Sequence, residues 1–343
     1  MNIINHSKGL LLLFLLLFWL QACDKAQNNN TGKSATQINK KTVYQKKFPL
    51  ASVSMDLVKV SEHVYYVRGK AGIATENEGF VSNAGVILTS QGIVLVDALG
   101  TPALAELLLE KIAQISDLPV KKVIVTHYHA DHVYGLQIFK DLGAEIIAPI
   151  GSYDYIDSST ATDRLEERRF SLDPWVNDNT HLVPPDKIID SETHFSLGGI
   201  EFVLSVLGKA HSDGDLTVYV KNDRVLLSGD IIFEGRVPYL GDSDTKTWLE
   251  TLGKLETSQL AALIPGHGAM ASNPNQALKE TRRYLFFMRD KMGQAVRDFV
   301  SFEEVYSATD WSEFNKLPAF DAANRRNAFQ VYLSMETELL EGG

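Results

Sequence analysis

A run of three histidines and one aspartate at positions 127 to 132 constrains this chain more than any other feature. It follows the apolar segment Val123-Ile124-Val125, which has the composition of a buried strand, and reads His127-Tyr128-His129-Ala130-Asp131-His132. Side chains alternate between the two faces of an extended segment, so His127 and His129 point the same way and can share one cation. Asp131 and His132 follow where the chain turns into the next helix, and they can hold a second cation beside the first.

The donor atoms of this run indicate which metal would bind. Imidazole nitrogen and carboxylate oxygen at this spacing fit Zn²⁺, and Fe or Mn would also be accepted because no thiolate enforces a softer metal. The competing interpretation is a polar loop whose histidines merely cap the following helix. A strand before the run and a helix after it favour the metal site.

The composition narrows the class of protein. The chain has 343 residues, of which 45% are hydrophobic, enough to bury the core of one large domain or two small ones. Its 33 Lys and Arg against 43 Asp and Glu give a net charge of -10. Such a body does not attract nucleic acid or anionic lipid, so we expect no nucleic-acid partner and a small-molecule substrate. We assign residues 49–343 to a single domain that ends in helices.

The first 22 residues have the features of a bacterial lipoprotein signal peptide. Lys8 supplies a positive charge, residues 9–20 are apolar, and Leu20-Gln21-Ala22-Cys23 resembles a lipobox. Cleavage before Cys23, the only cysteine, would leave its sulfur to be acylated. An uncleaved membrane anchor and an unmodified exported protein are the alternatives, but the apolar segment is short for a transmembrane helix.

Lipidation at Cys23 would place the mature protein outside the cytoplasm, tethered to a membrane surface. Asp24 stands where an acidic residue goes with inner-membrane retention in Gram-negative lipoproteins, so we expect the periplasmic face of that membrane. With no second cysteine, the chain forms no internal disulfide. Residues 23–48 are rich in Asn, Gln, Lys and Thr, and we expect them to form a flexible tether.

Strand-like and helix-like segments alternate along the domain after an antiparallel start. The expected strands cover residues 60–67, 79–88, 93–96, 122–125, 145–148, 201–206, 216–220, 225–227 and 261–264. The expected helices cover residues 102–115, 133–142, 161–170, 245–255, 278–299 and 322–340. Residues 151–187 are the least regular, and they form either an insertion that overhangs the site or a plain surface loop. His181 and His194 lack a metal-ligand context and are expected to be ordinary surface or structural histidines.

Three further candidate ligands, His211, Asp230 and His267, each stand at a junction between a strand and a loop. Nearby glycines are typical of backbone that turns sharply or approaches a ligand closely. Each candidate alone is weak, but together with residues 127–132 they indicate a metal site. Asp97, at the end of the strand 93–96, either caps the next helix or accepts a hydrogen bond from a metal-bound histidine, and both roles can hold.

The ordered set His-x-His-x-Asp-His, then His, Asp and His, resembles the metallo-β-lactamase superfamily over about residues 55–270. This resemblance implies an α/β fold of the four-layer αββα sandwich type, with a dinuclear metal site at one edge. Matched by position, it implies one zinc ion on His127, His129 and His211, a second zinc ion on Asp131, His132 and His267, and a bridge through Asp230.

The residue at position 230 indicates which branches of the superfamily the chain resembles. The commonest acquired β-lactamases have cysteine there and another subclass has serine, whereas aspartate resembles glyoxalase II, lactonases and related hydrolases. The glutathione-anchoring motif of glyoxalase II has no match in the C-terminal helices, and His129 stands where the diiron oxygen-reducing branch has glutamate. Residues 127–135, residues 210–215 and Arg325-Arg326-Asn327 are similar to exported zinc metallohydrolases of quinoprotein relay systems.

The chemistry expected of such a site is hydrolysis. Two cations about 3.5–4 Å apart can share a water, lower its pKa and present hydroxide to a carbonyl carbon. Asp131, besides binding a metal, would orient the hydroxide or transfer a proton. We predict a dinuclear zinc hydrolase of an ester, thioester, lactone or amide carbonyl. The alternatives are β-lactam hydrolysis and a non-catalytic or redox-accessory metal-binding module, and the sequence assigns no oligomeric state.

We expect metabolic labelling with a fatty acid to tag the wild-type chain in a Gram-negative host and to leave Cys23→Ser unlabelled, because only the Cys23 sulfur would receive the acyl chain. Ser34→Ala, in the predicted tether, serves as the matched control and should retain the label. Label that persists on Cys23→Ser would contradict the lipoprotein assignment.

Overall fold

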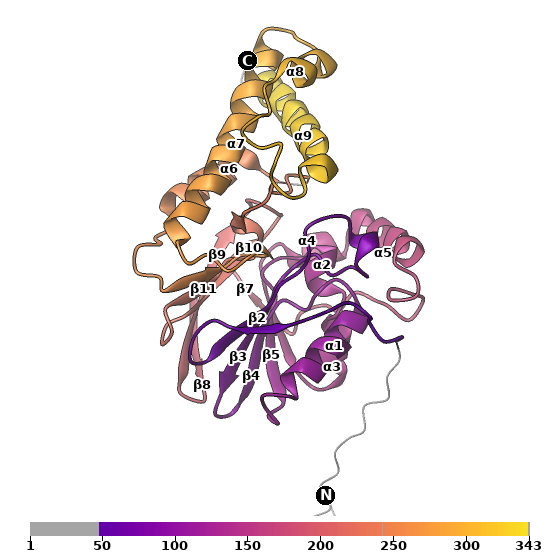
Figure 1. Ribbon diagram of the computed structural model, residues 1–343, viewed down its shortest axis with the longest axis vertical. Helices are drawn as coiled ribbons and strands as arrows, with labels where there is room; N and C mark the ends of the chain where they lie inside the picture. Colours follow the sequence, from indigo (N-terminus) through magenta and orange to yellow (C-terminus); the bar gives the residue numbers. More distant parts are fainter. Residues whose placement is uncertain (1–47, 242, 342–343) are drawn as a thin grey trace, which may run out of the picture. The chain divides into compact units, whose positions relative to one another are not determined.

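The computed structural model describes residues 48–341 apart from residue 242. The predicted signal peptide, the Cys23 lipidation site and the predicted tether up to residue 47 lie outside the described residues. All described residues belong to one compact unit, residues 44–343, whose elements are labelled in Figure 1. Within residues 48–341, residue 242 excepted, no helix combines the length and the apolar character needed to cross a membrane.

The first sheet joins an antiparallel half to a parallel half. Its strands follow chain order: β1 (Leu57–Lys59), β2 (Val64–Val67), β3 (Ala84–Thr89), β4 (Gly92–Val96), β5 (Val120–Ile124), β6 (Glu145–Pro149) and β7 (Lys187–Ile189). Strands β1 to β4 pair antiparallel, as predicted, and β4 to β7 pair parallel. The strand expected at residues 79–88 begins only at Ala84, because Glu78 and Gly79 have φ angles of 57° and 82°, which an extended strand excludes.

The second sheet is antiparallel except at one edge. Its order is β13-β11-β10-β9-β8, and β11 and β13 pair parallel. The bounds are β8 (Thr193–Leu197), β9 (Ile200–Gly208), β10 (Asp215–Val220), β11 (Val225–Leu227) and β13 (Ala262–Ile264). A separate pair, β12 (Phe233–Glu234) and β14 (His267–Gly268), extends the parallel edge toward the candidate ligands.

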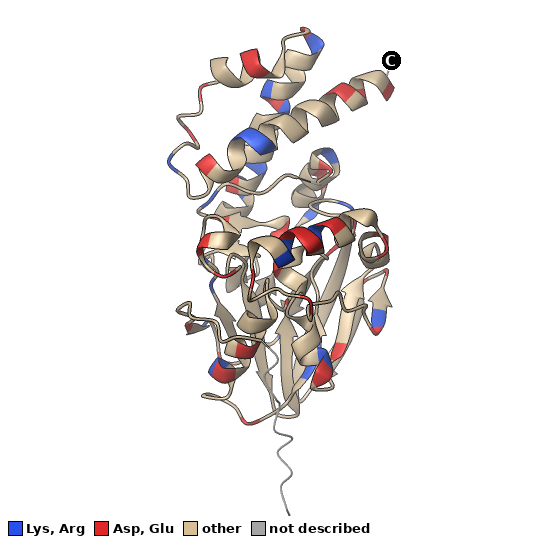
Figure 2. Ribbon diagram, turned by 90° about the vertical axis from the view of Figure 1, so that its right-hand side faces the viewer, with Lys and Arg blue, Asp and Glu red and all other residues tan. Residues whose placement is uncertain are grey.

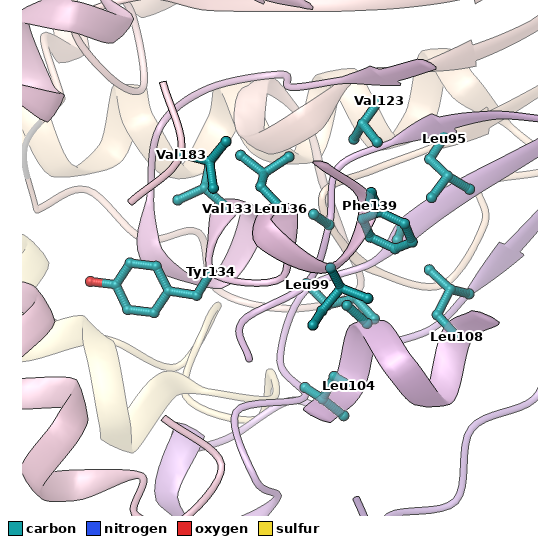
Figure 3. Packing of buried hydrophobic residues seen from close by; sticks show 14 of the residues in the cluster. Leu95, Leu99, Leu104, Leu108, Val123, Val133, Tyr134, Leu136, Phe139 and Val183 are labelled. Carbon is teal, nitrogen blue, oxygen red and sulfur yellow. The ribbon is translucent and has the colours of Figure 1, made fainter. Parts of the chain in front are cut away.

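Alternation along the strands sorts the apolar side chains into layers. In β4, Leu95 joins the core on the helix-covered side of the first sheet, whereas its neighbour Val94 joins the core between the two sheets. Figure 3 shows the helix-covered side, where Leu95 lies in one cluster with Leu108 and Phe139 of the covering helices. A third core, which includes Leu226 of β11, separates the second sheet from helices on its far face.

The helices complete the predicted four-layer αββα sandwich, which is confirmed (Figure 1). On the first sheet lie α1 (Pro102–Ile112) and α3 (Leu136–Asp141), and on the second lie α6 (Thr245–Lys254) and α7 (Pro274–Arg297). The remaining helices are α2 (Ala130–Val133), α4 (Ser152–Ile156), α5 (Ser159–Ser171), α8 (Phe302–Ala308) and α9 (Phe320–Glu341). The helix expected at 133–142 is two short ones, α2 and α3, that meet around Gly135.

Charged residues lie mainly on helices and loops, and Figure 2 shows basic and acidic positions interspersed along them while the inner strands carry few. This distribution agrees with the net charge of -10. A surface without a dominant basic field is consistent with the prediction that nucleic acid is not a partner, which stays a prediction.

We expect Gly135→Ala to lower the free energy of unfolding by about 1–3 kcal/mol, the range for an overpacked interior. A Cβ there would stand 2.0 Å from the carbonyl oxygen of Ala98, a backbone atom that cannot easily retreat. Gly253→Ala in α6 is the matched control, because its Cβ would meet nothing within 4 Å. The control should raise stability by up to about 1 kcal/mol in urea unfolding followed by circular dichroism. Equal effects of the two substitutions would contradict the packing described around Gly135.

Candidate metal centre

The candidate ligands gather at one edge of the sandwich. His127 and His129 follow β5, and Asp131 and His132 lie in the first turn of α2. The remaining three come from the second half of the chain: His211 between β9 and β10, Asp230 after β11, and His267 at the start of β14, which pairs with β12 outside the second sheet. Because β4, β5, β11 and β13 all end at this edge, seven residues separated by up to 140 positions meet there.

The first group consists of His127, His129 and His211, whose rings converge through nitrogen atoms. His129 Nδ1 lies 3.1 Å from His127 Nε2 and 3.0 Å from His211 Nε2. One shared proton cannot satisfy all three nitrogens. A tetrahedral zinc ion with Zn–N distances of about 2.0–2.1 Å holds its nitrogens about 3.3 Å apart, so the three rings are close to a ligand arrangement.

The second group consists of Asp131, His132 and His267. Asp131 Oδ2 lies 3.6 Å from His132 Nε2 and 3.2 Å from His267 Nε2. Both rings are buried, whereas the Asp131 side chain is 27% exposed. This group therefore joins two fixed imidazoles to one carboxylate that can reach a bound molecule.

Asp230 lies between the two groups. Its Oδ2 is 3.4 Å from His211 Nε2 in the first group and 3.1 Å from His267 Nε2 in the second. Its Oδ1 faces His132 Nε2 at 3.2 Å. A Cβ at residue 266 would stand 1.9 Å from Asp230 Oδ1, so only Gly266 leaves room for this carboxylate.

Asp97 sets the orientation of histidines in both groups. Its Oδ2 accepts a hydrogen bond from His132 Nδ1 at 2.9 Å, and it also accepts from the hydroxyl of Thr126 at 2.9 Å. The Thr126 oxygen is then free to accept from His127 Nδ1, 3.1 Å away. Both rings consequently present Nε2 to the centre. The capping role considered for Asp97 is wrong, because the side chain of Thr101 caps α1.

His267 is oriented by backbone. Its Nδ1 lies 2.7 Å from the carbonyl oxygen of Val81, which can only accept, so Nδ1 carries the proton and Nε2 faces the carboxylates. Arg236 Nη1 lies 3.4 Å from the same Nδ1 and, with that proton in place, forms no hydrogen bond to it. The side chain of Asn83 fixes the loop by donating to the carbonyl oxygens of Pro265 and Gly268.

Burial and charge act in opposite directions across the site. Burial lowers the pKa of His127 well below its usual value and that of His211 to about 3. Burial also opposes the charge on His132 and His267, but the neighbouring carboxylates of Asp230 and Asp131 together outweigh it and raise the pKa of both. Burial alone would raise the pKa of Asp230, yet these neighbouring imidazoles hold it well below its usual value. The centre therefore stabilises positive charge among its carboxylates.

Three buried nitrogen and oxygen atoms of the candidate ligands form no hydrogen bond of good geometry within the described part of the chain. They are His211 Nδ1 and the facing pair His132 Nε2 and Asp230 Oδ1. A buried polar atom without a partner costs about 1–3 kcal/mol, and a bound cation would offset that cost at His132 and Asp230. The two groups offer mainly imidazole nitrogens, with the Asp230 carboxylate between them and no thiolate. Such ligands suit zinc, and they would also accept iron or manganese.

A pocket of about 200 Å³ opens beside these groups. His129, Asp131, Asp230 and His267 contribute to its wall. From residues 151–187, the irregular stretch, come Tyr155, Thr160, Arg164, Arg168 and Leu172. This stretch therefore lines the site, and α4 and α5 form its helical part.

Sequence reasoning missed three residues of this pocket: Arg236, Tyr239 and Arg326. Arg236 and Tyr239 follow β12 in a segment without a recognisable pattern. Arg326 lies in the Arg325-Arg326-Asn327 stretch, which was noted only for its resemblance to other chains. His181 and His194 stand apart from the site as predicted, His181 near the Asn179 carbonyl and His194 beside Glu192.

Comparisons with known proteins agree with this geometry. The family model described as the metallo-beta-lactamase superfamily matches residues 77–267, more than half of the chain. A metallo-beta-lactamase of Chryseobacterium indologenes is 24% identical over 215 residues, covering 61% of this chain and 80% of that protein.

Solved structures share the fold. A metallo-beta-lactamase from Pontibacter korlensis superposes with a TM-score of 0.56 at 20% identity, covering 68% of this chain and 99% of that one. The sec-alkylsulfatase Pisa1 from Pseudomonas sp. superposes with a TM-score of 0.62 at 19% identity. This match covers 82% of this chain and 50% of the sulfatase. From the family match, this chain belongs to the metallo-beta-lactamase superfamily and is a hydrolase of that superfamily.

Proposed function

We propose that the chain is a dinuclear zinc hydrolase whose two ions are held by the groups described above. One ion would be bound by His127, His129 and His211, the other by Asp131, His132 and His267, with Asp230 between them. The position of Asp230, with one oxygen 3.1–3.4 Å from imidazoles of both groups, is the observation that carries this proposal. Bound there, the pair of ions would lower the pKa of a water and supply a nucleophile near neutral pH.

The protein's own residues then hold and orient the reactants. Asp97 and Thr126 keep His127 and His132 in the tautomer that presents Nε2. Asp131, the more exposed of the two carboxylates, borders the pocket and is placed to orient the attacking water or to take its proton. No serine or cysteine nucleophile is required.

The substrate would be a small molecule with an ester, thioester, lactone or amide carbonyl. Aspartate at position 230 supports this assignment over β-lactam hydrolysis, which stays the alternative because several curated relatives are metallo-beta-lactamases. A sulfate ester is a second candidate, since a sec-alkylsulfatase superposes on 82% of the chain. A non-catalytic metal-binding module is the third, and the resemblance to relay-system metallohydrolases stays a prediction.

We also propose that this chemistry takes place outside the cytoplasm, on a lipid tether at Cys23. The support is the sequence pattern of residues 1–23.

Metal analysis of the purified chain tests the ligand set. We expect close to two zinc ions per wild-type chain and a loss of at least one in His132→Ala, because that ring faces both Asp131 and Asp230. His194→Ala is the matched control, since its side chain is 65% exposed and pairs with Glu192, away from the metal groups. A wild-type chain that binds no metal after zinc loading, or a His132→Ala chain that keeps both ions, would overturn the assignment.

A substrate panel tests the reaction class. We expect the zinc-loaded chain to cleave at least one of a thioester, a lactone, a cephalosporin and an alkyl sulfate, and Asp131→Ala to lower kcat by about 10²–10⁴-fold, the usual contribution of acid–base catalysis. Asp213→Ala, an exposed carboxylate outside the metal groups, is the control and should keep full activity. Full biological function of Asp131→Ala, with no cleavage by the wild type, would favour the non-catalytic module.

A further inference from the structure

The pocket beside the metal groups has a charge opposite to that of the chain as a whole. Four arginines, Arg164, Arg168, Arg236 and Arg326, line it, whereas its acidic residues are Asp131 and Asp230. Those two carboxylates are candidate ligands and would be neutralised by bound cations. A cavity with four guanidinium groups in a chain of net charge -10 favours an anionic occupant.

The four arginines differ in whether a carboxylate of the protein already pairs with them. Arg164 and Arg168 are four residues apart on α5 and share Glu167, at 3.7 Å and 3.4 Å. No carboxylate pairs with Arg326 among the described residues. Its guanidinium instead lies over the ring of Tyr239, 5.3 Å from the ring centre, and remains exposed to solvent. Arg326 therefore keeps its hydrogen-bond donors available to a bound molecule.

The backbone around Arg326 is held to the pocket by its neighbour in sequence. The side chain of Asn327 accepts from Leu240 N at 2.9 Å and donates to the carbonyl oxygen of Pro238 at 2.7 Å. It also donates to the hydroxyl of Tyr284 on α7 at 3.0 Å. These buried bonds join α9 to the segment that carries Arg236 and Tyr239 (α9 is labelled in Figure 1). The backbone of Arg326 is thus held in a fixed position beside the pocket.

The pocket also has apolar surface. Ala74, Val81 and Leu172 contribute to it. A molecule that fills the pocket therefore contacts aliphatic side chains and guanidinium groups together. These two properties fit an amphiphilic organic anion better than an inorganic one.

We infer that the substrate carries an anionic group, a carboxylate or a sulfate, on an apolar body, and that Arg326 of α9 binds this group and determines specificity. The inference rests on the proposed hydrolase function and names the substrate class of that site. Arg326 lies outside residues 77–267, so the family match does not assign it. A guanidinium binds either group through two parallel N–H donors, and the two chemistries are separated below.

Direct binding tests this inference without turnover. Decane-1-sulfonate and decanoate, neither of which contains a hydrolysable bond, would be titrated calorimetrically into the zinc-loaded chain. We expect Arg326→Gln to weaken binding of the preferred anion by about ten-fold or more, the loss typical of a charge-assisted hydrogen bond. Tighter binding of the sulfonate would indicate a sulfate ester, and tighter binding of the decanoate would indicate a carboxylate.

Arg325→Gln is the matched control. Arg325 is adjacent in sequence but faces away from the pocket, where it pairs with Glu303 and lies over Phe302 and Tyr306. This variant should bind as the wild type does, and Arg326→Lys should recover part of the affinity. Failure of both anions to bind the wild type, or equal losses in Arg325→Gln and Arg326→Gln, would overturn the inference.

Kinetics separate this inference from the proposed function. On a matched pair of esters, one bearing a terminal carboxylate and one bearing a methyl group, Arg326→Gln should raise KM about ten-fold for the charged ester only, with kcat within about two-fold. Hydrolysis of both esters with equal KM in wild type and variant would contradict the inference and support the hydrolase. Anion binding that depends on Arg326, without cleavage of any substrate, would support the inference and contradict the hydrolase.

Discussion

The hydrogen bonds of the Asp97 carboxylate are the interactions on which both halves of the metal centre depend. It accepts from His132 directly and reaches His127 through the hydroxyl of Thr126, while the Thr126 amide donates to its Oδ1 at 2.8 Å. Asp97 has a φ of 66°, a left-handed conformation that costs a non-glycine residue about 1–3 kcal/mol. Hydrogen bonds to a charged group contribute about 1.5–3 kcal/mol each, so the bonds that use this carboxylate offset the strain that aims it.

The first sheet and its helix α2 provide only part of the centre, because His211, Asp230 and His267 come from the segments that follow β9, β11 and β13 of the second sheet. The distance between the two sets is fixed by the core between the sheets, where Val96 and Ile124 of one sheet and Leu227 and Ile264 of the other belong to a single buried cluster. Each of the four is the last residue of its strand, and the chain leads from there to a candidate ligand or, after Val96, to Asp97. Apolar packing therefore sets the geometry of the polar site, and a cavity in this layer would separate the two groups of donors.

Much of the fold, and the seven candidate ligands that the fold brings together, could be predicted from the sequence for a physical reason. Strand periodicity and the ligand spacing of residues 127–132 are local properties, so they can be recognised from the sequence alone. The Asp97 cap was mispredicted because a helix cap and a histidine acceptor look alike until the partner is placed. The place of Arg326 in the pocket could not be predicted, because its contact with Tyr239 joins positions 87 residues apart and depends on how α9 packs.

The structure separates the parts that serve chemistry from those that shape the pocket. Donor residues stand at strand ends, where Asp97, Gly266 and the backbone of Val81 leave them little freedom. Part of the pocket wall is built by α5, from the irregular stretch 151–187, and by α9, beyond the family-matched region. A substitution on α5 or α9 can therefore alter which molecule binds without moving a ligand nitrogen. Asn327 is an exception on α9, because its hydrogen bonds hold the helix to the Pro238–Leu240 segment. These bonds also keep the arginine-lined wall of the pocket in place beside the metal groups.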